Sequence, residues 1–446
     1  MTAPSQQLVD ELFEYIRIPS ISSGGGDPAA LVATAEWLKS KIESSGGDAH
    51  LVTDVGNPLV VGDLRASDPS APTVLIYGHY DVQSADPVDE WTSPPFSPEI
   101  RDGRIYARGA SDDKGNFYPL LFVACELAKA NELPVNVRCL IEGEEESGGT
   151  SAHAWMEGDD RGADCAIVFD SDMRDEKTPA LTIGVRGVIS FSVEVRCAQH
   201  DLHSGQYGGV SLNALHVLHT MLDEVLPGPH GVLRDELRAG IVPPTQEELD
   251  SWANFAPGAD EIAAGGGRPI DDLAASRFYE RTWGDASLDV NGIAGGDAIQ
   301  KRTIIPARSM AKFSIRLAPG QEATEIGAAA EGLMRAAAPP NADVHIEWAG
   351  GDAAAFDPGD QALSLAADAF EEISGVPTAL QRSGGSIPIL KDFYDRGIPT
   401  ILSGFAVAED GIHGVDESFR LESLALCEAA AHKLYEKLVA LGEAKP

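Results

Sequence analysis

Short, continuous runs of apolar residues recur in the first part of the chain. Val74–Ile76 and Ala166–Phe169 are runs of this kind, and Val135–Ile141 is apolar apart from Asn136 and Arg138. Segments with apolar residues at helical spacing, such as residues 31–42 and 117–129, accompany them. Continuous apolar runs are typical of parallel strands that are buried on both faces, and helices are the usual connections between such strands. The pattern therefore predicts an α/β domain with a doubly wound, mostly parallel sheet.

The pattern changes near Gly184. Apolar and polar residues alternate strictly over Ile189–Cys197, and they alternate again over Ala311–Leu317. Strict alternation predicts strands of a sheet that has one buried and one solvated face. Helical patterns follow both strands, so we expect residues 185–353 to form a two-layer α+β domain. We assign no elements to the glycine-spotted segment 227–300.

The first pattern returns after Gly350-Gly351, with a helix that begins at Gln361 and a strand at Pro399–Ser403. We therefore predict one α/β domain in two segments, residues 1–184 and 354–446, which the α+β domain interrupts. The insert has about 170 residues, which is a usual size for a domain.

The net charge and the cysteine content limit the binding partners and the cellular location that we expect for this protein. The chain has 33 lysines and arginines against 70 aspartates and glutamates, which gives a net charge of -37. A protein this negative is repelled by nucleic acids and by anionic membranes, so we expect neither as a partner. The five cysteines are widely spaced and mostly lie in apolar runs, which argues against a disulfide framework. Since the sequence shows no signal-peptide core and no membrane-spanning run, the expected location is the cytoplasm.

Histidines and carboxylates follow several of the predicted strands. Taken singly, each acidic cluster would be read as a solvated charge run or a helix cap. The carboxyl ends of parallel strands meet at one edge of a sheet, however, and so many carboxylates there would repel one another unless cations lay between them. Histidine and carboxylate ligands suit zinc, with manganese as the second choice. The residues concerned are His79, Asp112, Glu145, Glu146, Asp170 and His413, and Asp81 is the carboxylate that would fix the ring orientation of His79.

Four motifs stand in order along the chain: Gly78-His79-Tyr80-Asp81-Val82-Gln83, Gly109-x-x-Asp112-Asp113-Lys114-Gly115, Glu142-Gly143-Glu144-Glu145-Glu146-Ser147-Gly148 and His203-Ser204-Gly205. With them the chain resembles the dinuclear zinc metallopeptidases of peptidase family M20, which include carnosinase, cytosolic nonspecific dipeptidase, the aminoacylases and succinyl-diaminopimelate desuccinylase. The loop with Trp91, Pro95 and Phe96 and the segment Gly384–Pro388 are most similar to the dipeptidase and carnosinase branch.

The resemblance implies a metal site with two divalent ions per chain. Asp112 would bridge the two ions, with His79 and Asp170 completing one site and Glu146 and His413 the other. Asp81 would orient His79, and Glu145 would be the general base. The peptide bond between Asp112 and Asp113 would be cis. Asp172 is a second candidate beside Asp170, and Glu144 is an acid where relatives often carry an apolar residue.

The resemblance also implies the reaction, which is hydrolysis of the peptide bond of dipeptides or small peptides by a water activated between the metals. His203 would stabilise the developing oxyanion, and Arg316, Gly385 and Ser386 would contact the substrate. A turn histidine and a surface arginine are the alternative interpretations of His203 and Arg316. The inserted domain would act as a lid and form a homodimer, and His203 would reach the site of the partner subunit.

Two other functions are compatible with the same residues. An N-acyl-amino-acid amidohydrolase would use the same metals and differ in whether its pocket holds an acyl chain or a free ammonium group. A non-catalytic peptide-binding relative is disfavoured because such a protein has no need of the base Glu145.

Overall fold

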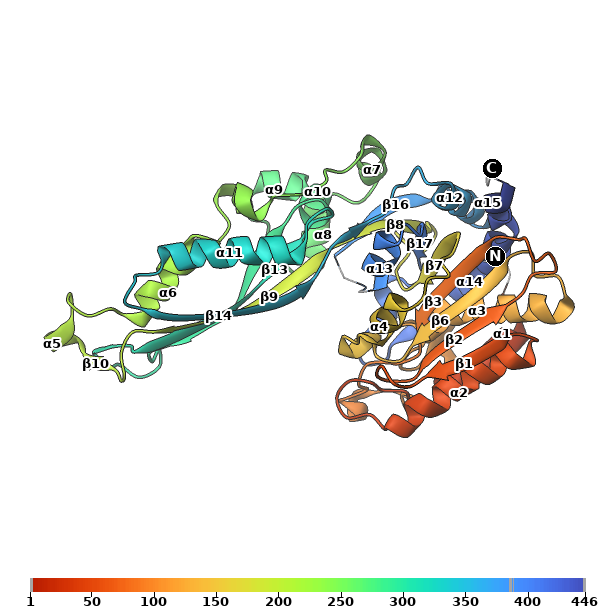
Figure 1. The fold of residues 1–446 in the computed structure, drawn as a ribbon, viewed down its shortest axis with the longest axis horizontal. Coiled ribbons are helices and arrows are strands. Elements are labelled where there is room, and N and C mark those ends of the chain that lie inside the picture. The colour runs from red at the N-terminus through yellow and green to blue at the C-terminus, as the bar shows by residue number, and fades with distance from the viewer. Residues whose placement is uncertain (1–2, 385–386, 388, 444–446) are drawn as a thin grey trace. The chain divides into compact units, whose positions relative to one another are not determined.

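A computed structural model gives the structure of this protein and describes residues 3–384, 387 and 389–443 (Figure 1). The chain forms two compact units. Unit 1 comprises residues 1–183, 356–381 and 387–446, and unit 2 comprises residues 184–355 and 382–386. No helix in the described part of the chain is long and apolar enough to cross a membrane.

Unit 1 is built on a six-stranded sheet. β3 pairs parallel with both β6 and β7, and β17 pairs parallel with β7, whereas β2 pairs antiparallel with β1 and β6. The predicted mostly parallel sheet is therefore confirmed. In spatial order the strands are β1 (Asp48–Val52), β2 (Leu59–Leu64), β6 (Asn136–Glu142), β3 (Thr73–His79), β7 (Cys165–Phe169) and β17 (Thr400–Ser403).

Helices pack against this sheet. α2 contacts β1 and β2, α3 contacts β3, α12 contacts β17, and α14 lies against α3 and α12 (Figure 1). A smaller sheet consists of β4 (Glu99–Arg101), β5 (Arg104–Tyr106) and β18 (Ser418–Arg420). The helices are α1 (Gln6–Ile16), α2 (Pro28–Ser44), α3 (Lys114–Ala130), α4 (Ser151–Glu157), α12 (Gln361–Ser374), α13 (Ile389–Asp395), α14 (Leu421–Leu438) and α15 (Ala440–Glu443), with 3-10 turns η1 (Val88–Glu90), η2 (Glu145–Ser147) and η5 (Ala408–Asp410).

Unit 2 is a two-layer α+β structure. Its antiparallel sheet has the order β11 (Ser287–Gly295), β13 (Arg308–Leu317), β9 (Gly187–Arg196) and β14 (Asp343–Gly351). Burial alternates along β9 and β13, as the sequence predicts, and the rings of Phe191 and Phe313 stack at 4.6 Å in the core. The helices α6 (Ala214–Asp223) and α11 (Ala323–Ala337) contact this sheet and each other (Figure 1).

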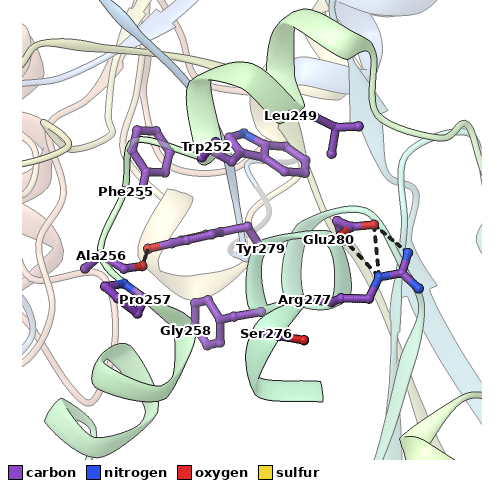
Figure 2. Close-up of a pocket in the computed structure, with 12 residues that line it drawn as sticks. Leu249, Trp252, Phe255, Ala256, Pro257, Gly258, Ser276, Arg277, Tyr279 and Glu280 are labelled. Atoms are coloured by element: carbon purple, nitrogen blue, oxygen red, sulfur yellow. Dashed lines mark hydrogen bonds and ion pairs between the residues drawn. The ribbon is translucent and has the colours of Figure 1, made fainter. Parts of the chain in front are cut away.

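The segment to which the sequence analysis assigns no elements contains several short ones. They are η3 (Pro229–Gly231), η4 (Asp235–Leu237), α7 (Gln246–Trp252), α8 (Gly258–Ala264), α9 (Asp272–Ser276), α10 (Phe278–Trp283) and the strand β11. A pocket of about 480 Å³ lies among these helices, and Figure 2 shows that Trp252, Phe255 and Tyr279 line it. The Tyr279 hydroxyl donates a hydrogen bond to the carbonyl oxygen of Ala256 at 2.9 Å.

Short strands complete the fold. In a three-stranded sheet, β8 (Ala180–Val185) lies between β15 (Ala354–Ala355) and β16 (Ala379–Ser383). Unit 2 also contains β10 (Leu202–His203), which pairs with β12 (Ile304–Ile305) and leads into α5 (Ser204–Tyr207). All five cysteines are free, in agreement with the prediction that no disulfide framework is present.

Candidate metal centre

The carboxyl ends of three neighbouring strands in unit 1 carry histidine or acidic residues. His79 is the last residue of β3, Asp170 directly follows β7, and Glu145 and Glu146 lie in η2, just after β6. Glycine at position 78 is required locally, because a Cβ atom there would lie 2.2 Å from the Phe117 ring.

Two loops bring the remaining candidate ligands to this edge. Asp112 lies between β5 and α3, and His413 lies in the loop that follows η5. His413 has a left-handed backbone with φ of 63°. The peptide bond between Asp112 and Asp113 is cis, as the resemblance implies.

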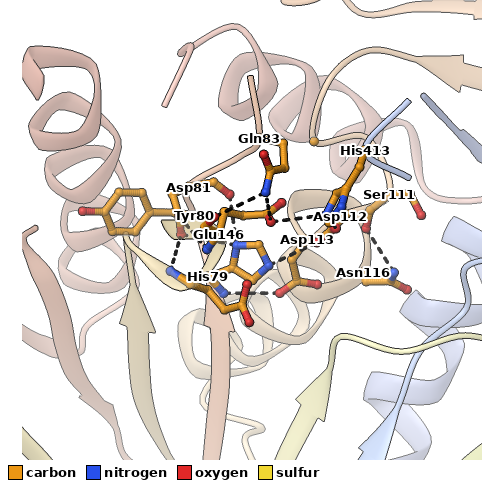
Figure 3. Close-up of polar contacts among 12 residues, drawn as sticks. His79, Tyr80, Asp81, Gln83, Ser111, Asp112, Asp113, Asn116, Glu146 and His413 are labelled. Carbon is orange, nitrogen blue, oxygen red and sulfur yellow. Dashed lines mark hydrogen bonds and ion pairs between the residues drawn. The ribbon is translucent and has the colours of Figure 1, made fainter. Parts of the chain in front are cut away.

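The candidate ligands form two groups that share Asp112. His79, Asp112 and Asp170 form the first group, and Asp112, Glu146 and His413 form the second, with the ligand atoms of each group within 4.8 Å of one another. Asp112 faces both histidines: its Oδ1 lies 3.1 Å from His79 Nε2, and its Oδ2 lies 3.0 Å from His413 Nε2 (Figure 3). Glu146 Oε2 lies 3.2 Å from His413 Nε2. One carboxylate thus offers a separate oxygen to each group.

These donors fit divalent cations. Two ligand atoms about 2.0–2.1 Å from a tetrahedral zinc ion lie roughly 3.3 Å apart, close to the separations between Asp112 and the two histidines. Imidazole nitrogens mixed with carboxylate oxygens suit zinc and manganese. Among the described residues, no lysine or arginine forms an ion pair with Asp112, Glu146 or Asp170. The negative charge of these carboxylates is therefore not balanced by lysine or arginine side chains of the described residues.

The pKa values of these groups also reflect crowded negative charge. Burial, and then the neighbouring carboxylates, raise the pKa of Asp170 well above its ordinary value. Burial alone would lower the pKa of His79, but its contacts with Asp112 and Asp81 outweigh burial and raise it well above the usual range. Hydrogen bonds to Asp112 and Glu146 raise the pKa of His413 to about 10. The raised pKa values of both histidines and of Asp170 reflect a surplus of negative charge that a bound cation would neutralise.

Asp81 supports both His79 and the acidic turn η2. His79 Nδ1 lies 3.0 Å from the backbone oxygen of Asp81 and 3.4 Å from its carboxylate, which directs Nε2 toward Asp112. The same carboxylate accepts hydrogen bonds from the backbone N–H groups of Glu145 at 3.3 Å and Glu146 at 3.1 Å. Asp81 thus fixes the backbone of Glu145 and Glu146 and also orients the ring of His79.

The clustered glutamates differ in their hydrogen-bond and ion-pair partners, and these differences indicate different roles. The Glu144 carboxylate accepts hydrogen bonds from the backbone N–H groups of Asn57, Thr150 and Ser151 at 2.9–3.0 Å, so it stabilises the local backbone. The Glu146 carboxylate contacts His413 and accepts a hydrogen bond from Gln83 Nε2 at 2.9 Å.

Glu145 differs from both neighbours. In the described part of the chain, its carboxylate has no hydrogen-bond or ion-pair partner, and burial raises its pKa to about 7. A carboxylate with a pKa near neutrality is well suited to accept and release protons.

The structure also places the other predicted site residues. Asp172 lies outside both groups, and its Oδ1 accepts a hydrogen bond from Gln381 at 3.2 Å. His203 and Arg316 lie in unit 2. His203 Nδ1 accepts a hydrogen bond from the backbone N–H of Gly205 at 3.1 Å, and Arg316 Nη1 lies 3.4 Å from the carbonyl oxygen of Gly384. Gly385 and Ser386 lie outside the described residues.

Three further residues, which no sequence pattern marks as part of the site, hold it in place. Gln83 contacts Glu146, and the buried pair Arg108 and Glu417 binds the loop of Asp112. Gln83 stands inside a motif, and Glu417 follows His413 by four positions, but neither spacing by itself indicates these contacts.

Paired groups of histidines and carboxylates that could hold metal ions, at the edge of a mostly parallel sheet, are typical of metal-dependent hydrolases. A sequence profile described as "Peptidase family M20/M25/M40" matches residues 75–437. The chain belongs to this family, as the motifs predict.

Individual relatives agree with the family assignment. The "Cys-Gly metallodipeptidase DUG1" of Saccharomyces cerevisiae is 28% identical over 94% of this chain and 92% of its own length. The "Beta-Ala-His dipeptidase" of Homo sapiens is 30% identical over 81% of this chain and 73% of its own. The solved structure of the dipeptidase Dug1p from Saccharomyces cerevisiae has a TM-score of 0.74 and 26% identity, and it covers 99% of this chain and 96% of that one. The predictions of the fold class and of metal-dependent dipeptide hydrolysis are confirmed at this level.

Proposed function

We propose that the chain hydrolyses the peptide bond of dipeptides with two divalent metal ions, zinc first and manganese second. His79, Asp112 and Asp170 would hold one ion, and Asp112, Glu146 and His413 the other. The observation that carries the proposal is the pair of ligand groups that share Asp112, with the unengaged carboxylate of Glu145 close in sequence to Glu146. Bound in these groups, the ions would lower the pKa of a water molecule and polarise the scissile carbonyl.

Glu145 acts as the general base in this proposal. Its carboxylate accepts a proton as the water attacks the carbonyl carbon and then delivers that proton to the leaving amine. Burial supports this role because it raises the pKa of Glu145 to about 7. Asp81 supports it by fixing the backbone of the segment that carries Glu145.

His203 would donate a hydrogen bond to the oxygen on which negative charge develops. Since Nδ1 of His203 accepts a hydrogen bond from Gly205, the proton of the neutral ring resides on Nε2. That nitrogen is a donor of the kind that stabilises an oxyanion. Arg316 would bind the terminal carboxylate of the substrate, aided by Gly385 and Ser386, because a guanidinium can hold a carboxylate through two hydrogen bonds.

We further propose that unit 2 acts as a lid and forms a homodimer. The strand β11 is one of the two edge strands of its sheet in the described part of the chain, and Val290 and Ile293 on it are exposed by 37% and 59%. An apolar pocket of about 550 Å³ lies beside them and is also lined by Leu215 and Leu222 of α6. An edge strand with exposed apolar residues next to an apolar groove suits pairing with the same strand of a second copy. The free cysteines support a cytoplasmic location.

The proposal predicts that hydrolysis depends on metal and favours dipeptides. A chelator should abolish activity, and zinc or manganese should restore it, because the ligands carry the reaction only with a cation present. Purified protein should contain about two metal ions per chain and hydrolyse a panel of dipeptides faster than the matching N-acetyl amino acids. Preference for the N-acetyl compounds would identify an amidohydrolase instead, whereas metal binding without any hydrolysis would identify a peptide-binding protein.

Metal binding should also release protons. The raised pKa values of His79 and His413 mean that both rings carry a proton at pH 7 before a metal binds. A cation must displace those protons, so the apparent affinity should rise with pH by about tenfold per unit for each proton displaced. Calorimetric titration in buffers of different ionisation enthalpy between pH 6 and 8 measures this release. An affinity that is independent of pH would contradict the assignment of the histidines as ligands.

A further inference from the structure

The two groups of candidate ligands are held by different kinds of structure. His79 ends the buried strand β3, and Asp170 directly follows β7, so the first group stands on the sheet. In the second group, Glu146 lies on a turn and His413 on a loop, and the shared Asp112 lies on another loop. Ligands on loops need additional contacts to stay in place.

The buried carboxylate of Glu417 accepts hydrogen bonds from several backbone N–H groups of the Asp112 loop. Glu417 Oε1 accepts hydrogen bonds from the backbone N–H groups of Ser111 at 2.9 Å and Asp112 at 3.0 Å. Its Oε2 accepts one from the N–H of Gly109 at 2.9 Å and one from Arg108 Nη1 at 2.8 Å. The exposed fractions of the Arg108 and Glu417 side chains are only 2% and 1%. These four donors fill the capacity of an ionised carboxylate, which fixes the loop in one conformation.

The arginine of this pair reaches two further loops. Arg108 Nη2 donates to the backbone oxygen of Ser84 at 2.9 Å and to that of His413 at 3.3 Å. Ser84 directly follows Gln83, whose side chain donates to the Glu146 carboxylate at 2.9 Å (Figure 3). The pair therefore connects the loop of Asp112, the loop of His413 and the segment that contacts Glu146.

We propose that Arg108 and Glu417 are positioning residues for the second ligand group. Loss of the hydrogen bonds made by either side chain then weakens metal binding in the second group more than in the first. Neither side chain belongs to a ligand group, so each acts only through the loops that it holds. When these loops shift, the first group loses the alignment of Asp112 but keeps His79 and Asp170 on the sheet, whereas the second group loses the alignment of Asp112 and His413 together. The inference rests on the proposed function only in taking both groups as metal sites.

The test uses Glu417→Gln in the full chain. The amide keeps the size of the side chain but turns an N–H group toward backbone donors, so the Asp112 loop loses part of its support. After metal removal, zinc is titrated back and the dissociation constants of the two binding steps are measured. Glu146→Gln, which removes a ligand of the second group alone, identifies which step belongs to that group. We expect the second group of Glu417→Gln to bind about ten- to a hundredfold more weakly, and the first to change by less than about threefold.

A second variant covers the possibility that Glu417→Gln does not fold. Arg108→Lys keeps the positive charge beside Glu417 but loses the nitrogen that binds Ser84 and His413, and the same selective weakening is expected. The matched control is Glu248→Gln in unit 2, where Arg382 and Glu248 form an equally buried ion pair with side chains exposed by 4% and 2%. This control should lower thermal stability and leave both dissociation constants unchanged.

The outcomes separate positioning from simple stabilisation of the fold. Selective loss of affinity in the second group supports the inference. Wild-type affinities in both groups, or equal weakening of both, would overturn it, because a pair that only stabilises the fold has no reason to favour one group. The readout is metal binding, so a protein that binds metal normally but hydrolyses no dipeptide would contradict the proposed function and leave this inference intact.

Discussion

Replacing Glu145 with glutamine should lower kcat by about a hundredfold or more while the protein keeps about two metal ions per chain. The substitution keeps the shape of the side chain but removes the group that accepts the proton of the attacking water, and general bases contribute about 10²–10⁴-fold to rates. The Glu145 carboxylate has no protein partner in the described part of the chain, so its loss should leave the surrounding contacts intact. Metal analysis beside steady-state kinetics measures both quantities.

Glu144 offers a matched control one position away. Its carboxylate accepts three backbone hydrogen bonds, from Asn57, Thr150 and Ser151, so Glu144→Gln should lower thermal stability and change kcat by only a few-fold. Loss of metal together with activity in Glu145→Gln would show that Glu145 is a ligand. A large loss of kcat in Glu144→Gln with Glu145→Gln active would move the base by one position.

The strands of the α/β sheet could be predicted because strands buried on both faces consist largely of apolar residues. Residues such as Val74 and Ile76 are fully buried, and continuous apolar runs of this kind occur where a strand has no solvated face. The same logic predicts that residues after these strands meet at one edge, and the structure brings His79, Asp112, Asp170, Glu146 and His413 together there.

Contacts between distant loops could not be predicted in the same way. Arg108 and Glu417 are about three hundred positions apart, and no local pattern connects an arginine with a carboxylate over such a separation. The role of Glu144 was equally hidden, because its partners are backbone N–H groups that carry no sequence signal. The helices α7 to α10 have five to seven residues each, too few turns for a helical period to stand out.

Replacing His203 should also have a large effect on activity, and the proposed homodimer determines which site is affected. The hypothesis is that His203 serves the site of the partner subunit, whereas Glu145 serves its own. Glu145→Ala and His203→Ala should then each be inactive when expressed alone. Co-expression of the two chains, with different affinity tags, allows mixed dimers to be purified and counted.

In a mixed dimer one site lacks both groups, while the other has its own Glu145 and receives an intact His203 from the partner. Random pairing makes about half of the dimers mixed, each with one complete site, so roughly a quarter of the wild-type activity should return. If His203 instead acts within its own chain, every site in the mixture lacks one group and no activity returns. Absence of recovery in purified mixed dimers would therefore exclude the shared site, and the role of unit 2 would be confined to its own subunit.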